Sequence, residues 1–146
     1  MDDLHFKLLD LSAQGYCCSQ IMFLMALEMQ GKSSPDLVRS VGGLCHGIAF
    51  SGNTCGVLTG GACLISYYAG RGSGSEEMKP GCATMLTELA YWFKNDIGST
   101  YGGADCAAIL MRSPDRSACR DIVLATYRKI LDLLVENGID PSESSS

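Results

Sequence analysis

The chain has 146 residues, of which 47% are hydrophobic and 18% charged, and its formal net charge is -5. This length and apolar content suit a single domain with its own core. The 11 basic residues are scattered along the chain. Nucleic acids and anionic membrane surfaces attract concentrated Lys and Arg, so we expect neither as a partner. The sequence also lacks an apolar run of the roughly 18–20 residues that a membrane helix needs and a recognisable signal peptide, so we expect a cytoplasmic protein.

Apolar spacing predicts three helices in the first part of the chain. An apolar face repeated at i, i+4 and i+7 predicts a helix over residues 2–13. Residues 18–30 are apolar around most of the helix circumference, which predicts a central and buried helix. A Ser-Pro-Asp sequence at 34–36 has the N-cap, proline and acidic residue of a helix start, and a short helix to about residue 44 is expected after it.

The middle of the chain is rich in glycine. Residues 42–56 interleave glycines with apolar residues, which indicates a packed central loop and not a linker. The helix expected over residues 55–68 also contains glycines, each costing about 1 kcal/mol relative to alanine. Such glycines are tolerable where another backbone or a cofactor comes close. We therefore treat Gly56 and Gly60 as candidate cofactor-binding residues.

The second half predicts further helices. Apolar spacing over residues 85–97 indicates an amphipathic helix, followed by a glycine-rich turn over 98–103 and a short helix over 105–111. A Ser-Pro-Asp sequence at 113–115 opens the last helix, and Asn-Gly at 137–138 ends it.

Strand signals are nearly absent, so the sequence predicts an all-α fold. We expect a compact bundle of about six or seven helices with a glycine-rich central loop. Residues 1–139 form a single helical redox domain in this interpretation, and residues 140–146 a disordered polar tail.

Four of the eight cysteines share one predicted setting. Cys18, Cys55, Cys106 and Cys119 each fall near the N-terminus of an expected helix. Unpaired N–H groups and the helix dipole favour negative charge there. This setting predicts thiol pKa values below the usual value of about 8.5, and hence thiolates available as ligands or nucleophiles.

Several chemistries remain compatible with these four cysteines. Four thiolates with N–H donors directed at sulfur would suit an iron–sulfur cluster, although no Cys-x-x-Cys ligand run occurs. Two of the same cysteines could instead serve a metal-free thiol–disulfide oxidoreductase or sensor. A zinc site is disfavoured, because structural zinc ligands usually come in closely spaced pairs. The remaining alternative is a non-catalytic helical module with buried structural thiols.

The other four cysteines have less distinctive settings, and the role of Cys82 among them stays open. Cys17 adjoins Cys18, and successive helical side chains point about 100° apart, so both cannot easily bind one metal. We expect Cys17 to be a filler residue in the core or at the surface, with a spare thiol or a disulfide-exchange partner as the alternative. We expect Cys63 to be a core residue. Cys45 is the candidate for an additional metal ligand, because His46 and glycine pairs surround it. His46 could itself ligate a metal, but we expect it to hydrogen-bond a backbone carbonyl.

The residues that carry these cysteines also resemble a known family. Residues 15–20 (GYCCSQ) and 55–60 (CGVLTG), followed by single cysteines at 106 and 119, resemble the C-GCAxxG-C-C family of redox-active proteins. The resemblance covers most of the chain. One departure is Val57, which stands where the family signature has alanine and adds bulk beside the expected site.

The resemblance implies a small helical redox domain, similar to the non-haem part of split-Soret cytochromes, which carries an iron–sulfur centre. The haem-binding portion is missing, because no Cys-x-x-Cys-His sequence occurs. We expect a [2Fe–2S] cluster in preference to [4Fe–4S], and no cofactor if the disulfide alternative holds. The expected role is electron transfer or redox sensing with a partner protein of unknown identity. We favour an electron carrier or redox partner over a stand-alone enzyme. The oligomeric state stays open, with a homodimer among the options.

Overall fold

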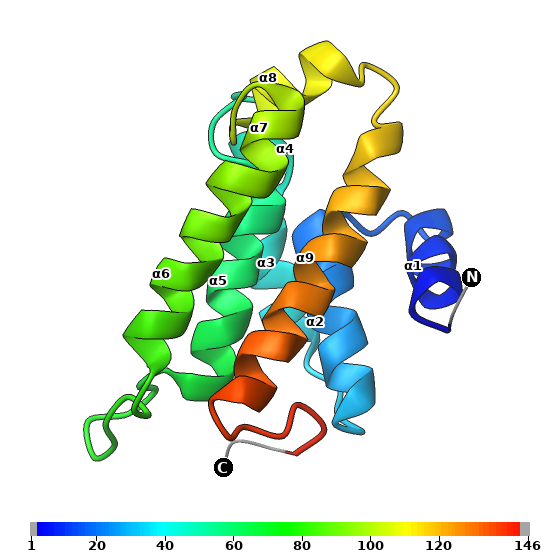
Figure 1. Cartoon of the computed structure of the whole chain (residues 1–146). Helices are drawn as coiled ribbons and strands as arrows, with labels where there is room; N and C mark the ends of the chain where they lie inside the picture. Colours follow the sequence, from blue (N-terminus) through cyan, green and yellow to red (C-terminus); the bar gives the residue numbers. More distant parts are fainter. Residues whose placement is uncertain (1–2, 144–146) are drawn as a thin grey trace.

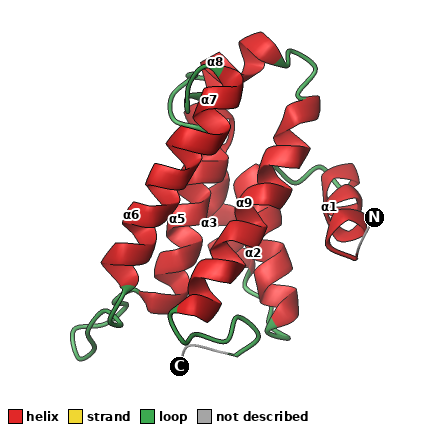
Figure 2. Ribbon diagram, viewed as in Figure 1, coloured by secondary structure: helices red, strands yellow, loops and turns green. Residues whose placement is uncertain are grey.

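The structure is a computed structural model that describes residues 3–143. Within these residues it has seven helices of seven residues or more, several shorter helical turns and no strand (Figure 1, Figure 2). The predicted all-α bundle is therefore confirmed. None of the helices in residues 3–143 is long and apolar enough to span a membrane.

The elements follow one another along the chain in this order: α1 (Asp3–Ala13), α2 (Cys18–Met29), α3 (Pro35–Val41), η1 (Gly42–Leu44), α4 (Cys45–Ile48), α5 (Gly56–Ala69), α6 (Cys82–Trp92), η2 (Phe93–Ile97), α7 (Gly98–Tyr101), α8 (Cys106–Arg112) and α9 (Ser117–Glu136).

The core forms where α5 packs against α2, α6 and α9 (Figure 1). Helix α2 buries residues on most of its circumference, as its apolar sequence predicts. The core includes the large side chains Phe23, Leu64, Leu89 and Tyr127, all fully buried. Helices α4, α7 and α8 gather at one end of this bundle, and the loop between α5 and α6 lies at the other (Figure 1).

Two side chains of the Ser-Pro-Asp sequence at 113–115 stabilise the start of α9, where this sequence predicts a helix start. The Ser113 hydroxyl oxygen accepts the N–H of Ala118 at 3.1 Å, and the Asp115 carboxylate accepts the N–H of Ser117 at 3.0 Å. Both bonds satisfy N–H groups that have no partner inside the helix. The 20-residue helix ends at Glu136, with Asn137 as its C-cap and Gly138 beyond it at a φ of +76°.

The segment after α6 differs from the prediction. Helix α6 continues through the π-helical turn η2 into α7, so Gly98 is helical and does not begin a turn. The chain reverses only at Gly102 and Gly103, whose φ values are +79° and +158°. A π-helical turn inserts an extra residue without breaking the helix, which apolar spacing alone does not reveal.

The glycine-rich central loop contains a left-handed turn over residues 46–50. All five residues have positive φ, including the β-branched Ile48 at +66° and Phe50 at +69°. The turn is closed by i→i−4 hydrogen bonds from Ala49 to Cys45 and from Phe50 to His46. Left-handed helical conformation costs roughly 1–2 kcal/mol for each residue with a Cβ. We call residues 46–50 the left-handed turn.

The predicted disordered tail spans residues 140–146, of which 144–146 lie outside the described residues. Residues 140–143 fold back onto the bundle. The Tyr68 hydroxyl donates to the carbonyl of Pro141 at 2.7 Å, and the Gln30 amide donates to the carbonyl of Glu143 at 2.9 Å.

Candidate functional site: a cavity lined by four cysteines

The four cysteines singled out in the sequence lie at the starts of four different helices. Cys18 is the first residue of α2, and Cys55 is the N-cap of α5. Cys106 is the first residue of α8, and Cys119 is the third residue of α9. The prediction that all four lie near helix N-termini is confirmed.

These four side chains line one cavity of about 300 Å³, which we call the cysteine cavity. Cys55 is buried, and the other three are partly exposed. The rest of the wall is largely apolar and includes Leu8, Ile21, Val57, Leu110 and Val123. Residues more than 100 positions apart in the chain therefore share one partly open, sulfur-lined cavity.

Two loops pair with each other to bring Cys55 beside Cys106. The N–H of Cys55 donates to the carbonyl of Ala104 at 3.0 Å, and the N–H of Cys106 donates to the carbonyl of Asn53 at 2.7 Å. The isolated bridge between Thr54 and Asp105 lies between these two bonds. The pairing fixes the starts of α5 and α8 relative to each other.

Backbone N–H groups at the helix starts favour negative charge on two of the sulfurs. The N–H of Ser19 acts to lower the pKa of Cys18, and the N–H groups of Val57 and Leu58 act to lower the pKa of Cys55. Such donors stabilise negative charge on sulfur and tune bound clusters.

The prediction of lowered thiol pKa values is wrong for Cys18, Cys55 and Cys119. Burial raises the pKa of Cys18 to about 11 and that of Cys55 to about 12, despite the backbone N–H donors. Burial also raises the pKa of Cys119, and the neighbouring Cys106 raises it further. Desolvation of the thiolate outweighs the favourable helix N-termini. Without a bound cation, Cys18, Cys55 and Cys119 are therefore neutral thiols near neutral pH.

Glycines allow close packing around the cavity. A Cβ on Gly56 would lie 2.6 Å from the carbonyl oxygen of Leu44 and 3.1 Å from the Cys18 sulfur. A Cβ on Gly60 would lie 2.6 Å from the Cβ of Ser19. Gly56 therefore borders the cysteine cavity, whereas Gly60 lies where α5 crosses α2.

A cationic side chain closes one side of the cavity. The Arg116 guanidinium contacts Nδ1 of His46 and lies 5.2 Å from the ring centre of Phe50, on which the His46 ring stacks. Burial and Arg116 both lower the pKa of His46, and Arg116 also acts to lower the pKa of Cys119. The partner of His46 is thus Arg116 and not the expected backbone carbonyl. Arg116 lies 70 residues from His46, and no sequence motif indicated their contact.

Cys17 and Cys45, the expected filler and the candidate additional ligand, form a disulfide. Cys45 is 4% exposed, and Cys17 lines the cysteine cavity beside Cys18. While the disulfide is intact, Cys45 offers no thiolate to a metal. The sequence showed only that Cys17 and Cys18 are adjacent. It could not identify Cys45 as the partner of Cys17, because a disulfide across 28 residues depends on the fold.

The remaining two cysteines lie away from the cavity lining. Cys82 is buried at the start of α6. Cys63 is exposed, so the prediction of a core position is wrong. Helix α5 buries the face that carries Gly60, Gly61 and Leu64, and Cys63 lies outside that face.

The four cavity cysteines suit a metal cluster better than a site for a single metal ion. In residues 3–143, no three His, Cys, Asp or Glu side chains are close enough together to hold one metal ion. A cluster distributes its four thiolates over at least two irons, so its ligands are spaced more widely than those of a single ion. Four cysteines around one cavity fit such a cluster, and backbone N–H groups near Cys18 and Cys55 favour negative charge on two of the sulfurs.

Comparison with known proteins agrees with this arrangement. A family model described as "Putative redox-active protein (C_GCAxxG_C_C)" matches residues 16–133. Searches of curated proteins and of solved structures find no match. The matched segment contains all four cysteines of the cavity and spans most of the chain. The chain therefore belongs to the C_GCAxxG_C_C family of redox-active proteins.

Proposed function

We propose that this protein binds an iron–sulfur cluster in the cysteine cavity, through Cys18, Cys55, Cys106 and Cys119. The observation that carries the proposal is the convergence of these four side chains, from four helix starts, on one cavity. A cluster bound there would accept and release single electrons. The protein would then act in electron transfer or redox sensing, and a [2Fe–2S] core is the form we favour.

The electrostatics of the cavity support this proposal. Burial raises the pKa of Cys18 to about 11 and of Cys55 to about 12, so burial alone disfavours the thiolate form of both. Bound iron supplies the positive charge that stabilises the thiolate form. The N–H groups of Ser19, Val57 and Leu58 would then share the negative charge on the sulfurs.

The partial exposure of Cys18, Cys106 and Cys119 supports electron exchange with a partner. The buried Cys55 and the apolar wall around Val57 would limit solvent access from the other side. Solvent exposure and hydrogen bonds to sulfur are main determinants of cluster reduction potential. We expect the redox partner to contact the face that carries the starts of α8 and α9.

The experiment is anaerobic reconstitution with ferrous iron and sulfide, read by visible absorption. Wild type and the Cys63→Ser control should develop the charge-transfer bands of a cluster. Each serine variant of the four cavity cysteines should lose or markedly weaken them. A colourless wild type, or bands that persist unchanged in all four serine variants, would contradict the proposal. If a colourless wild type instead loses two cavity thiols on oxidation, the metal-free thiol–disulfide alternative is the correct one.

A further inference from the structure

We propose that the Cys17–Cys45 disulfide is a second redox site, which exchanges with a dithiol partner and controls the left-handed turn. Neither cysteine is one of the four that we propose as cluster ligands, and this second proposal does not depend on a bound cluster. The pair connects the N-cap of α2 to Cys45, the residue immediately before the left-handed turn.

Each sulfur of the pair faces an oxygen that can accept a thiol proton. The Ser19 hydroxyl, which is fully buried, donates its single proton to the carbonyl of Val41 at 2.7 Å. Its oxygen lies 2.9 Å from the Cys45 sulfur and is free to accept an S–H group from the reduced cysteine. A purely structural disulfide needs no such acceptor.

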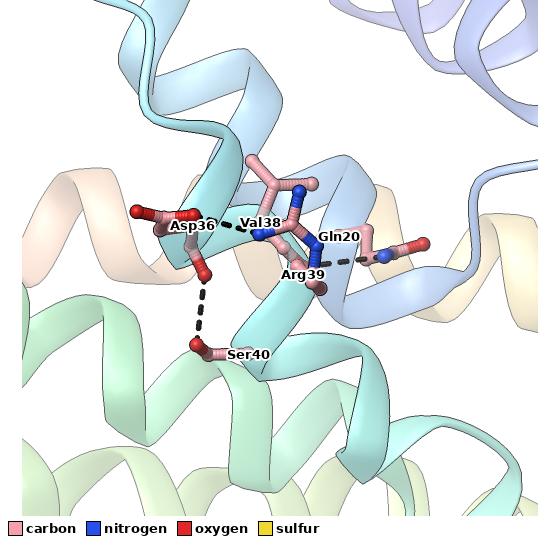
Figure 3. Close-up of polar contacts among 5 residues, drawn as sticks. All are labelled: Gln20, Asp36, Val38, Arg39 and Ser40. Atoms are coloured by element: carbon pink, nitrogen blue, oxygen red, sulfur yellow. Dashed lines mark hydrogen bonds and ion pairs between the residues drawn. The ribbon is translucent and has the colours of Figure 1, made fainter.

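The Cys17 sulfur also lies near an oxygen that can accept its thiol proton after reduction. The side-chain oxygen of Gln20 lies 3.4 Å from the Cys17 sulfur. The Gln20 amide nitrogen is held by the carbonyl of Val38 at 3.2 Å, which orients the oxygen toward Cys17. Figure 3 shows Gln20 reaching toward α3, whose Arg39 pairs with Asp36 at 2.7 Å. Reduction therefore leaves neither thiol without a hydrogen-bond partner.

The two sulfurs differ in solvent exposure, and this difference determines which of them an incoming thiolate can attack. Cys17 is partly exposed and lines the cysteine cavity, whereas Cys45 is 4% exposed. An attacking thiolate must therefore approach the sulfur of Cys17. The S–S bond breaks as the new bond to Cys17 forms, and Cys45 leaves as a thiolate that takes a proton. The second thiol of the partner dithiol then attacks the mixed disulfide, which releases Cys17 as a thiol and the partner as a disulfide.

The disulfide also restrains an unusual stretch of backbone. Four residues with a Cβ have positive φ in the left-handed turn, an arrangement that persists only where its surroundings enforce it. Cys45 fixes its start through the disulfide, and the N–H of Asn53, bonded to the carbonyl of Gly47, holds it further along. Reduction removes the covalent restraint. Because His46 and its contact with Arg116 belong to the cavity wall, loosening of the turn would open that wall.

The test counts thiols in the folded protein after treatment with a small dithiol such as dithiothreitol. Mass spectrometry should find six alkylated cysteines before reduction and eight after it once the protein is denatured, with Cys17 and Cys45 as the two that change. The change should reverse on reoxidation and should be absent in Cys17→Ser/Cys45→Ser. It should be unaffected in Cys63→Ser apart from the one missing thiol. A pair that resists excess dithiol until denaturant is added, or eight free thiols under oxidising conditions, would overturn the proposal.

Two further readouts separate a redox role from a structural one. Ser19→Ala removes the acceptor for the reduced Cys45 thiol, so it should shift the midpoint potential of the pair to a more negative value. Ser19→Thr, which keeps the hydroxyl, should restore it. Amide hydrogen exchange should quicken over residues 49–53 on reduction, and not over α9. The proposed control of the left-handed turn by the disulfide would be contradicted by two results together. These are an unchanged midpoint potential in Ser19→Ala and unchanged amide hydrogen exchange over residues 49–53 on reduction. Both measurements use metal-free protein, so failure of cluster binding does not affect their outcome.

Discussion

Gly56 lies so close to Cys18 that a Cβ built on it would be 3.1 Å from the Cys18 sulfur. The same Cβ would be 2.6 Å from the carbonyl oxygen of Leu44. The start of α5 thus fits between a backbone carbonyl and one of the cavity thiols.

Gly56→Ala should destabilise the protein by about 1–3 kcal/mol, because the backbone carbonyl of Leu44 cannot move away cheaply. Urea denaturation measures the free energy of unfolding. The control is Gly43→Ala, since a Cβ on Gly43 meets nothing within 4 Å. Equal stability of the two variants would show that the close approach of Gly56 is not restrictive.

Ile48→Gly should stabilise the protein by about 1 kcal/mol, because Ile48 has a φ of +66°, a conformation that glycine adopts without steric cost. The side chain is 54% exposed, so its removal sacrifices little packing. Ile48→Ala is the control, because it removes most of the side chain but keeps the Cβ. It should leave the melting temperature nearly unchanged. A loss of stability in Ile48→Gly alone would contradict the left-handed conformation of this turn.

Tyr127→Phe should be neutral or stabilising by up to about 1 kcal/mol, because removal of an unsatisfied buried hydroxyl relieves its desolvation cost. Within residues 3–143, the buried Tyr127 hydroxyl has no hydrogen-bond partner. Tyr68→Phe is the matched variant, because the Tyr68 hydroxyl donates to the carbonyl of Pro141. That variant should lose about 1 kcal/mol. Calorimetry measures the stability of both variants. If Tyr127→Phe were less stable than Tyr68→Phe, the Tyr127 hydroxyl could not be the unpaired one.

In metal-free protein, alkylation of Cys18 and Cys55 should be slow near neutral pH and should accelerate up to a pH of about 11 to 12. Only the thiolate reacts, and burial raises the pKa of Cys18 to about 11 and that of Cys55 to about 12. The same cysteines in urea-unfolded protein provide the control, since the ordinary pKa of a solvated cysteine thiol is about 8.5. Folded and unfolded rates that match near pH 8 would contradict the burial of these thiols.

The same shifts fix the sign of the stability change with pH. The unfolded chain loses its thiol protons at about pH 8.5, before the folded protein does, so unfolding becomes more favourable as pH rises. The contribution of Cys18 and Cys55 to stability is therefore fully present below this unfolded-state pKa and is lost as pH rises toward their raised pKa values. Metal-free protein should unfold at lower urea concentration at about pH 10 than at about pH 8.

Much of this fold was predictable because its signals are local. The bounds of α1 and α2 follow from apolar spacing and from the residues at their ends, and the helix-start setting of Cys18 and Cys119 followed from those bounds and from the start of α9. The Ser-Pro-Asp sequence marked that start through side chains that bond nearby N–H groups.

The features that escaped prediction depend on contacts between distant residues. The Cys17–Cys45 disulfide and the Arg116–His46 contact require the folded arrangement. The raised pKa of Cys55 depends on its burial in the folded protein. This burial outweighs the effect of the helix N-terminus, which the sequence does predict. The left-handed turn has only one glycine among its five residues, so composition did not indicate it.

The most direct test of the cluster assignment is native mass spectrometry of anaerobically reconstituted protein. We expect one iron–sulfur core per chain in wild type and in Cys63→Ser. We expect loss of that core in the variant with serine at positions 18, 55, 106 and 119. A wild-type mass equal to that of the bare polypeptide, or an identical mass gain in the quadruple variant, would contradict the assignment.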